Sequence, residues 1–579
     1  MKSFVAMTED RKIAYFSMEI GLDPRMPTYS GGLGILAADT IRASADMAVP
    51  TVGVTLLARK GYFYQRLDSD GQQSEQPENW NVSNFLQPLS NRISVVLEGR
   101  TVQVQAWKYG VTGISGHEVP VFFLDTDLKE NSPYDRQLSH YLYGGDQRYR
   151  LCQEIILGIG GVRMLRSLGY HNIERFHMNE GHAGLLALEL LTEEIEKTGG
   201  VSISADLIEA VRAKCVFTTH TPVPAGQDKY PMDLVRQVIG KHKVLELEHE
   251  LCCDPGVLNM TYLGLHLSHY INGVSRKHGR VSSQMFGSYV IDSITNGVHA
   301  ATWVSKSIAE LLDKYIPSWR ENNFSLRYAL SLPKKEIWNA HIEAKRHLLE
   351  YIKQQTTIEM DLDVFTIGFA RRATAYKRAD LLFYDIDRLK KISQNSGKFQ
   401  LVFAGKAHPK DQQGKEIIRK VFQAKQLLQP DIKLAYLPNY NIEVAKILIP
   451  GVDLWLNTPQ PPHEASGTSG MKAALNAVPS LSILDGWWIE GYVEGLTGWA
   501  IAEEPRPAGT QLHSEQQNVR DSVKDTSALY DKLEHLIVPM FYNHKRTYLG
   551  IMTNALALNG SFFNTQRMLE EYILKAYFL

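Results

Sequence analysis

The sequence predicts an α/β protein with two halves, each built on a largely parallel β-sheet flanked by helices. Its 579 residues exceed the length of a common domain several times over. Short apolar runs recur along the chain, each ending in a turn with Gly, Asn or Thr and leading into a helix-like stretch, as parallel strands with crossover helices do. With 44% hydrophobic and 22% charged residues, the composition is that of an ordinary globular protein.

The apolar runs define the expected strands in order. In the first half these are residues 12–17, 51–58, 175–179, 214–219 and 289–295. In the second half they are residues 364–370, 400–405, 433–437, 452–457 and 481–484. Leu382, Ile386 and Leu389 recur at helical spacing and predict a helix with one face on a sheet. Residues 302–360 and 526–579 lack strand-like runs and are expected to be helical. We therefore divide the chain into domains 1–300 and 301–579.

Charge and cysteine content exclude several classes of function. Lys and Arg number 62 and Asp and Glu 63, so the net charge of −1 recruits neither nucleic acid nor an anionic membrane. The four cysteines, two of them adjacent at Cys252 and Cys253, form neither a disulfide framework nor a common zinc pattern. No signal-peptide core or membrane-spanning run is present. We expect a cytoplasmic protein without nucleic-acid or membrane partners.

The first cluster with chemical potential follows the strand 364–370. Arg371, Arg372, Lys377 and Arg378 place four cations at the expected carboxyl end of a strand, where ligands of α/β sheets bind. Arginine forks there suit a doubly charged oxyanion such as phosphate. The alternative is a solvated basic turn, which charge runs usually are.

The second cluster spans residues 462–476. Its small residues allow a backbone to approach a ligand closely, and Ser466, Thr468 and Ser469 stand before a predicted helix whose N-terminus favours phosphate. Lys472 falls early in that helix, against the macrodipole preference, and forming a Schiff base with an aldehyde cofactor would explain it. The alternative is a Gly/Ser loop with a surface lysine. Gly467 stands where a His-Glu-x-x-His site needs its second His, so we predict no metal.

Weaker signals lie in the first half. The glycine turn 29–39 lacks the full dinucleotide fingerprint but suits a backbone anion cradle. Polar turns follow the strands ending at Asn179 and Thr219, and His182 in the first of them is more often structural than catalytic. Three tryptophans could stack on sugars, although burial is the commoner role: Trp80, Trp487 and Trp488.

Together these segments resemble the α-glucan phosphorylase family, the glycogen, starch and maltodextrin phosphorylases. The run Leu484 to Glu490 resembles its short bacterial branch. The resemblance extends in order from about residue 12 to residue 500, and these segments carry it: 30–34, 177–182, 218–222, 295–298, 370–378, 404–409 and 464–472. It implies a glycosyltransferase B-type fold, with two Rossmann-like lobes and an active-site cleft between them. The first lobe would face the glucan and the cofactor phosphate, and the second would carry the cofactor lysine and the basic cluster.

The resemblance also implies roles for individual residues. Lys472 would hold pyridoxal 5′-phosphate as a Schiff base. The cofactor would further contact Thr468, Ser469, Gly32 and Lys377. The residues implied in catalysis are His220, Arg372, Lys377 and Arg371, of which Arg372 and Lys377 bind the attacking phosphate. The residues implied in sugar binding are Gly31, Leu33, Asn296, Tyr376, Glu464, Ser466 and Gly467, with His220 and Asn296 at the 6-hydroxyl and Tyr376 at the 2-hydroxyl.

The reaction implied is reversible, retaining phosphorolysis of α-1,4-glucans or maltooligosaccharides by inorganic phosphate, which yields α-glucose 1-phosphate. The cofactor phosphate, with a second pKa near 6, would relay a proton. A homodimer is expected from the family alone.

Departures from the family pattern bear on specificity. Arg371 stands where many members have lysine, and Thr374 where many have histidine. The chain is shorter than most members and has no counterpart of the N-terminal segment that carries phosphorylation control in animal members.

Two other functions compete. A nucleotide-sugar glucan synthase would carry a second glutamate eight residues after Glu464, where this chain has Lys472. A non-catalytic, phosphorylase-like regulator that binds glucan would not need the cations and the lysine together.

Overall fold

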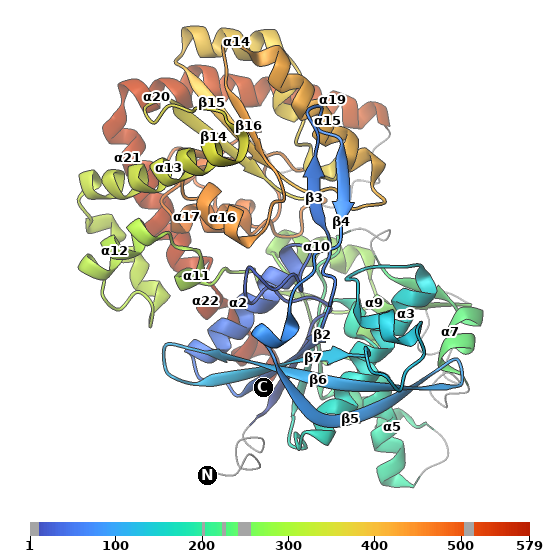
Figure 1. Ribbon diagram of the computed structural model, residues 1–579. Helices are drawn as coiled ribbons and strands as arrows, with labels where there is room; N and C mark the ends of the chain where they lie inside the picture. The colour runs from blue at the N-terminus through green and yellow to red at the C-terminus, as the bar shows by residue number, and fades with distance from the viewer. Residues whose placement is uncertain (1–10, 200–202, 223–226, 241–255, 503–514, 579) are drawn as a thin grey trace.

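The computed structural model describes residues 11–199, 203–222, 227–240, 256–502 and 515–578, with only the backbone of 515–519. Two large sheets lie in separate halves of the molecule, one low and one high in the view of Figure 1. Both contain parallel strands, and helices separate these strands along the chain. The α/β prediction is confirmed. Among the described residues no helix is long and apolar enough to cross a membrane.

The first sheet is parallel along most of its width and antiparallel at one edge. In spatial order its strands are β13 (Asp292–Ser293), β12 (Tyr270–Gly273), β9 (Cys215–Thr218), β8 (Arg175–Asn179), β1 (Ile13–Phe16), β2 (Thr51–Leu56), β7 (Glu118–Asp125), β6 (Arg100–Thr112) and β5 (Gln87–Leu97). Its central strands β1 and β2 are buried throughout, as expected for strands covered on both faces.

Helices and short turns accompany this sheet. They are α2 (Gly32–Asp46), η1 (Val82–Asn84), η2 (Asp135–Ser139), α3 (Gln147–Ile155), η3 (Ile156–Gly160), α4 (Gly161–Ser167), η4 (Gly181–Ala183), α5 (Leu186–Thr198), α6 (Ala205–Arg212), α7 (Met232–Ile239), α9 (Met260–His266) and α10 (Arg276–Met285). Two strands pair beside them, β10 (Lys229–Pro231) and β11 (Val257–Asn259).

The second sheet is parallel throughout its described strands. In order these are β16 (Leu434–Leu437), β15 (Phe399–Ala404), β14 (Phe365–Ala370), β17 (Leu454–Asn457), β18 (Ser480–Ser482) and β19 (Gly498–Ala500). The accompanying helices are α11 (Ala300–Trp303), α12 (Lys306–Tyr315), η7 (Asn323–Ser331), α13 (Lys334–Thr356), η8 (Ala375–Lys377), η9 (Leu381–Phe383), α14 (Ile386–Asn395), α15 (Gln412–Leu428), α16 (Ile442–Leu448), α17 (Ser469–Leu475), α18 (Trp488–Gly491), α19 (Glu515–Lys532), η10 (Leu533–Ile537), α20 (Val538–Asn543), α21 (Lys545–Asn554) and η11 (Ala555–Gly560).

The end of the chain returns to the first sheet. Helices α22 (Thr565–Tyr572) and η12 (Ile573–Tyr577) share a buried cluster with Ile13 of β1 and Leu36 of α2, and α22 lies beside α2 in Figure 1. The Tyr577 hydroxyl is 2.7 Å from His177 Nδ1 on β8. Residues 565–577 therefore stabilise the half of the molecule in which the chain began.

A hairpin of the first half reaches the second sheet. Its strands β3 (Tyr64–Leu67) and β4 (Gln73–Gln76) rise beside β16 and α15 in Figure 1. Gln65 exchanges two hydrogen bonds with Asn439, and Gln73 exchanges two with Ala407. The hairpin thus meets loops that follow β15 and β16.

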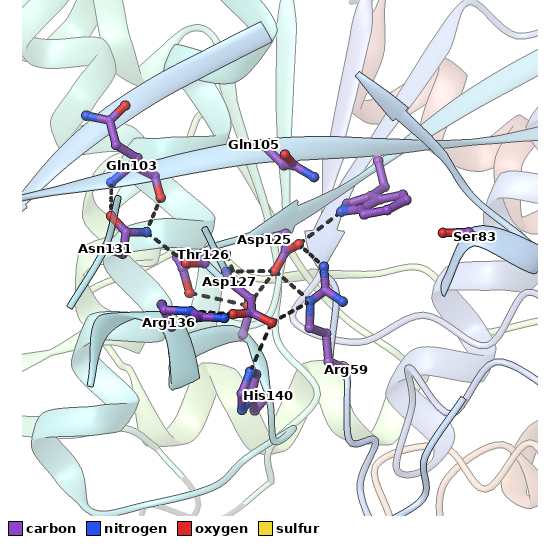
Figure 2. A network of polar contacts seen from close by, with 12 residues as sticks. Arg59, Ser83, Gln103, Gln105, Asp125, Thr126, Asp127, Asn131, Arg136 and His140 are labelled. Atoms are coloured by element: carbon purple, nitrogen blue, oxygen red, sulfur yellow. Dashed lines mark hydrogen bonds and ion pairs between the residues drawn. The ribbon is translucent and has the colours of Figure 1, made fainter. Parts of the chain in front are cut away.

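A buried carboxylate anchors the base of this hairpin arm. Asp125, at the end of β7, accepts hydrogen bonds from the Arg59 guanidinium, from Trp107 Nε1 (3.0 Å) and from Ser139 Oγ (2.9 Å). Figure 2 shows Arg59 against Asp125, with Asp127 beside them. Arg59 lies between β2 and the hairpin, so this network fixes where the arm leaves the first sheet.

The strands expected from the sequence are all present, with ends that differ by a few residues. The prediction missed β5 and β6, whose exposed and buried residues intermix, and the polar hairpin β3–β4. It also missed β7, β12 and β19 of the two large sheets and the short pair β10–β11. The helix expected around Leu382 begins only at Ile386, because Leu381–Phe383 form a separate 3₁₀ turn. Residues 302–360 and the described part of 526–579 are helical, as predicted. Cys152 and Cys215 are buried free thiols, and Cys252 and Cys253 lie outside the described residues.

Candidate active site

One cavity of about 1550 Å³ is lined by loops that follow the carboxyl ends of strands in both sheets. Every residue for which the resemblance implied a catalytic, cofactor-binding or sugar-binding role lines it. They are His220, Arg371, Arg372, Lys377, Lys472, Thr468, Ser469, Gly31, Gly32, Leu33, Asn296, Tyr376, Glu464, Ser466 and Gly467. The chain therefore brings together segments that lie hundreds of residues apart.

The basic turn after β14 presents its cations in two ways. Lys377 Nζ lies 2.5 Å and Arg371 Nη2 2.7 Å from the same oxygen, Oε2 of Glu464. Arg372 is exposed and makes no hydrogen bond or ion pair with the described residues. Its guanidinium packs against Gly31, where a Cβ would lie 3.3 Å from Arg372 Nε. Arg372 is thus a cation available to an anion in the cavity.

Arg378 does not belong to this site. The sequence analysis grouped it with the other three cations, but it turns away from the cavity at a positive φ of 47°. It donates hydrogen bonds to the carbonyls of Thr458 and Pro459 and pairs with Asp525. Arg378 therefore ties the basic turn to neighbouring loops.

Glu464 is a buried carboxylate held ionised by its neighbours. Burial raises its pKa, but Arg371 and Lys377 outweigh burial, and the net pKa is lowered. Its backbone N–H donates to Asp485 Oδ2 (2.9 Å), and Asp485 pairs with Lys277. The motif 484–490, which the sequence analysis used only to identify the branch, therefore braces the loop that carries Glu464.

Two predicted sugar-binding residues present buried polar atoms without a partner. Ser466 Oγ and Asn296 Oδ1 make no hydrogen bond, and both residues line the cavity. Buried polar atoms are rarely left unsatisfied in native proteins. A ligand hydroxyl in the cavity would satisfy them.

Lys472 lies within helix α17 and is buried. Burial lowers the pKa of its amine to about 8. Its Nζ lies 3.5 Å from the ring centre of Trp303 and has no carboxylate partner among the described residues. Thr468 caps the same helix, and Ser469 Oγ accepts a hydrogen bond from Trp455 Nε1 (3.2 Å). The amine is accessible from the cavity and much of it is neutral near pH 8, as attack on an aldehyde requires.

The glycine turn before α2 is organised by a carboxylate that the sequence analysis missed. Glu19, just after β1, accepts from the backbone N–H groups of Ser30 (2.5 Å) and Gly31 (3.1 Å) and from the Tyr143 hydroxyl (2.8 Å). A Cβ at Gly34 would lie 2.7 Å from Glu19 Oε2, so glycine is required there. The expected anion cradle therefore has two of its N–H groups directed at Glu19. The sequence signal that could have identified Glu19 is its place as an acidic residue shortly after the strand β1.

His220 is positioned by the turn 179–180. Its Nε2 lies 2.6 Å from Asn179 Oδ1, and its backbone N–H donates to Glu180 Oε2 (2.7 Å). Burial lowers the pKa of His220 to about 3, so the ring is neutral. Glu180 adopts a positive φ of 76°, a strained conformation of the kind found at functional sites.

A charged cluster forms the wall of the cavity beyond His220. Arg150 pairs with Glu154 (3.3 Å) and Asp228 (3.0 Å), and His182 Nε2 lies 3.4 Å from Asp228. Glu154, His182 and Asp228 each offer one oxygen or nitrogen atom, and these three atoms lie close enough to one another to hold a metal ion. Arg150 already supplies a cation between the two carboxylates. The sequence analysis discussed only His182 of this group.

The tryptophans considered for sugar stacking have other surroundings. Trp487 and Trp488 are buried in the core of the second half, where they pack on each other. Trp80 donates to the carbonyl of Ala58 and does not line the cavity. Trp303, which the sequence analysis did not select, is the tryptophan beside Lys472.

Comparison with known proteins decides the family. A sequence profile described as "Carbohydrate phosphorylase" matches residues 248–576. The maltodextrin phosphorylase of Thermococcus litoralis is 37% identical over 98% of this chain and 70% of its own length. This chain belongs to the carbohydrate phosphorylase family. The glycogen phosphorylase of Aquifex aeolicus is 35% identical over 98% of this carbohydrate phosphorylase and 86% of its own length. An uncharacterised protein of Methanocaldococcus jannaschii is 32% identical over 97% of this chain and 99% of its own.

Proposed function

We propose that this chain catalyses the phosphorolysis of α-1,4-glucans, releasing α-glucose 1-phosphate with retention of configuration. Relatives named maltodextrin phosphorylase and glycogen phosphorylase support the reaction class. The observation that carries the proposal is the convergence of Arg371, Arg372 and Lys377 with Glu464 and Lys472 in one cavity. A nucleotide-sugar synthase has no use for Lys472 at that place.

The cations are proposed to hold the attacking phosphate. Arg372 is unpaired and exposed, and its planar fork suits phosphate oxygens. Lys377 and Arg371 add positive charge, part of which Glu464 offsets. As the glycosidic bond breaks, positive charge develops on the sugar ring, and a phosphate held on the same face stabilises it and then attacks that face. Attack on the face of the sugar from which the leaving group departed retains the configuration of the anomeric carbon.

The glucose unit is proposed to lie between Glu464 and the first sheet. Glu464 Oε1, which makes no hydrogen bond within the described residues, accepts from a sugar hydroxyl. Ser466, the backbone of Gly467 and Tyr376 contact the remaining hydroxyls on that side. His220 accepts a hydrogen bond from the 6-hydroxyl, whose oxygen accepts one from the Asn296 side-chain NH₂, and Gly31 and Leu33 line the ring pocket. The unpartnered Oγ of Ser466 supports this placement.

Members of this family generally use pyridoxal 5′-phosphate, and the residues present fit that group. Lys472 offers a buried amine without an acidic partner, and Thr468, Ser469 and Gly32 lie on the same cavity. When bound, the cofactor would supply a phosphate that gives and takes a proton near neutral pH. Lys377 and Arg372 would reduce the repulsion between that phosphate and the substrate phosphate.

The division of the chain into two lobes is also a proposal. Residues 1–300 and 301–579 would be the two Rossmann-like lobes of a glycosyltransferase B-type fold, with the active-site cleft between them. The strand-end loops of both sheets on one cavity support this. The helices of residues 565–577 would then belong structurally to the first lobe.

The test is release of glucose 1-phosphate from a series of maltooligosaccharides, with pyridoxal 5′-phosphate in excess. We expect release that requires inorganic phosphate and rises with chain length until the acceptor cleft is filled. Release of free glucose without phosphate, or no turnover of any chain length with the cofactor bound, would overturn the proposal.

A further inference from the structure

Asn179, the last residue of β8, contacts His220 but has no role in the proposed function so far. Asn179 is buried, with 1% of its surface exposed. Asn179 Oδ1 lies 2.6 Å from His220 Nε2, and Asn179 Nδ2 donates to Ser17 Oγ (3.1 Å). Ser17 Oγ in turn donates to the carbonyl of Glu19 (2.7 Å). A chain of hydrogen bonds therefore runs from the backbone after β1 to the imidazole of His220.

The direction of this chain is fixed at its far end. The Glu19 carbonyl can only accept, so the single proton of the Ser17 hydroxyl points toward it. Ser17 Oγ must then accept from Asn179, which turns the amide NH₂ toward Ser17 and the amide oxygen toward His220. An oxygen 2.6 Å from Nε2 requires a proton on Nε2. In neutral His220 the Nδ1 atom is consequently the bare acceptor.

The remaining surroundings of His220 leave Nδ1 for a ligand. Nδ1 makes no hydrogen bond with the described residues, and His220 lines the cavity. The titratable groups around the ring are Glu180, which holds the His220 backbone, His177 on β8, His182 in η4 and His278 on α10. The carboxylate of Glu180 is directed at backbone N–H groups and at Thr221. No carboxylate of the described residues is paired with the imidazole itself.

We propose that Asn179 is a positioning residue that locks His220 in the Nε2–H tautomer, so that Nδ1 accepts a hydrogen bond from the 6-hydroxyl of the glucose unit. This assignment rests on the proposed function for the identity of the hydroxyl. The tautomer itself follows from the hydrogen bonds alone. A sugar without a 6-hydroxyl gains nothing from the lock, so Asn179 contributes to selection of glucose units.

The kinetic test uses Asn179→Asp, with Asn272→Asp as the matched control. Asn272 is equally buried on β12, two strands away in the same sheet, but bonds to the hydroxyls of Thr218 and Tyr572 rather than to a histidine. The rate constant kcat/KM for glucan synthesis is measured from pH 4 to 8 with glucose 1-phosphate and with 6-deoxyglucose 1-phosphate. The ratio of the two cancels the titration of the phosphates they share.

An aspartate at residue 179 still accepts from Nε2–H, but its charge raises the pKa of His220 by one to three units, to about 4–6. Below that pH the ring carries a proton on Nδ1 and loses its acceptor. We expect the preference for the 6-hydroxyl to fall about threefold to tenfold on acidification in Asn179→Asp. The wild type and Asn272→Asp should keep a flat ratio. A flat ratio in Asn179→Asp, or the same acid loss with both substrates, would overturn the proposal.

A second measurement reads the tautomer without any turnover. In protein labelled with ¹⁵N-histidine, the His220 signal is identified by its disappearance in His220→Gln. We expect Nε2 to carry the proton and Nδ1 to be bare near pH 7, and a protonated Nδ1 would contradict the proposal. If the wild type lacked synthesis activity but showed this tautomer, the proposed function would fail while the role of Asn179 in setting the tautomer would stand.

Discussion

Two buried carboxylates in the second half of the molecule are each held by two basic groups, yet their surroundings differ. Asp453 precedes β17 in the core, fully buried, and contacts Lys345 Nζ (2.6 Å), His341 Nε2 (2.9 Å) and the Thr366 N–H (2.7 Å). Glu464 lines the cavity and contacts Lys377 and Arg371 through one oxygen only.

The difference separates folding from binding. Both oxygens of Asp453 are satisfied by groups on α13 and β14, and the Tyr548 hydroxyl donates to its backbone carbonyl. Glu464 keeps Oε1 without a hydrogen bond within the described residues, and Arg372 nearby is unpaired. The core cluster is closed and stabilises the sheet, whereas the cavity cluster retains capacity for a ligand. Changes in the first should cost stability, and changes in the second should cost activity.

The largest effect is expected from Lys345→Met. It leaves the Asp453 carboxylate buried without its cation, which typically costs about 3–5 kcal/mol. We expect the free energy of unfolding in urea to fall by that amount, with kcat/KM per folded molecule unchanged. Lys353→Met on the same helix removes an exposed pair with Glu359 and should leave the free energy of unfolding nearly unchanged. Equal losses in the two variants would remove the distinction between closed and exposed pairs.

Lys377→Met should lower activity strongly and stability little, the opposite of Lys345→Met. Removing a cation that stabilises transferring phosphate is expected to lower kcat/KM for phosphorolysis at least about a hundredfold. Stability should change far less than in Lys345→Met, because Glu464 keeps Arg371. Lys420→Met, which breaks an exposed pair with Asp380, serves as the control. A Lys377→Met protein with wild-type kinetics and a lowered unfolding free energy would reverse the comparison.

Acid should weaken the core cluster at a defined pH. Burial raises the pKa of Asp453, but Lys345 and His341 outweigh burial and lower it from 3.8 to about 2. Since the folded-state pKa lies below the unfolded one, the stabilisation is complete well above pH 4 and is lost as the pH falls toward 2. It amounts to about 2 kcal/mol. Urea midpoints from pH 5 to 2 should fall less steeply in Asp453→Asn than in the wild type, and parallel curves would count against this assignment.

The smallest effect concerns Lys472, a buried lysine that, unlike Lys345, faces a ring instead of a carboxylate. Trp303 favours its ammonium form by about 1 kcal/mol. Trp303→Leu should therefore lower the pKa of Lys472 below about 8 by less than about one unit, while Trp303→Phe should retain most of the effect. The readout is the pH dependence of reductive trapping of pyridoxal 5′-phosphate on the apoprotein. A raised apparent pKa of Lys472 in Trp303→Leu would show that the Trp303 ring does not stabilise the ammonium form.

The parts of the molecule that could be predicted are those that a short stretch of neighbouring residues identifies. Strands β14 and β15 are predominantly apolar runs, and their order along the chain is visible without a structure. The basic turn and Lys472 were found because their residue types are unusual where they stand. The sequence around a residue does not show where its side chain points. Arg378 was therefore grouped with the site, although its positive φ directs the side chain away from the cavity.

Features that depend on long-range contacts were not predictable in this way. Glu19 is one acid after a strand, and its role depends on Ser30 and Tyr143, which lie eleven and 124 residues away. The hairpin β3–β4 is polar, and its hydrogen-bond partners lie more than 300 residues further along the chain. The pairing of Asp453 with Lys345 likewise appears only once α13 packs on the second sheet.

The most direct test of the central claim is ³¹P NMR of the complete reaction of maltoheptaose, inorganic phosphate and pyridoxal 5′-phosphate. We expect the wild type to form α-glucose 1-phosphate, and Lys472→Ala and Lys377→Met to form little or none under the same conditions. Formation of the β-anomer, or equal product from Lys472→Ala and the wild type, would contradict the central claim.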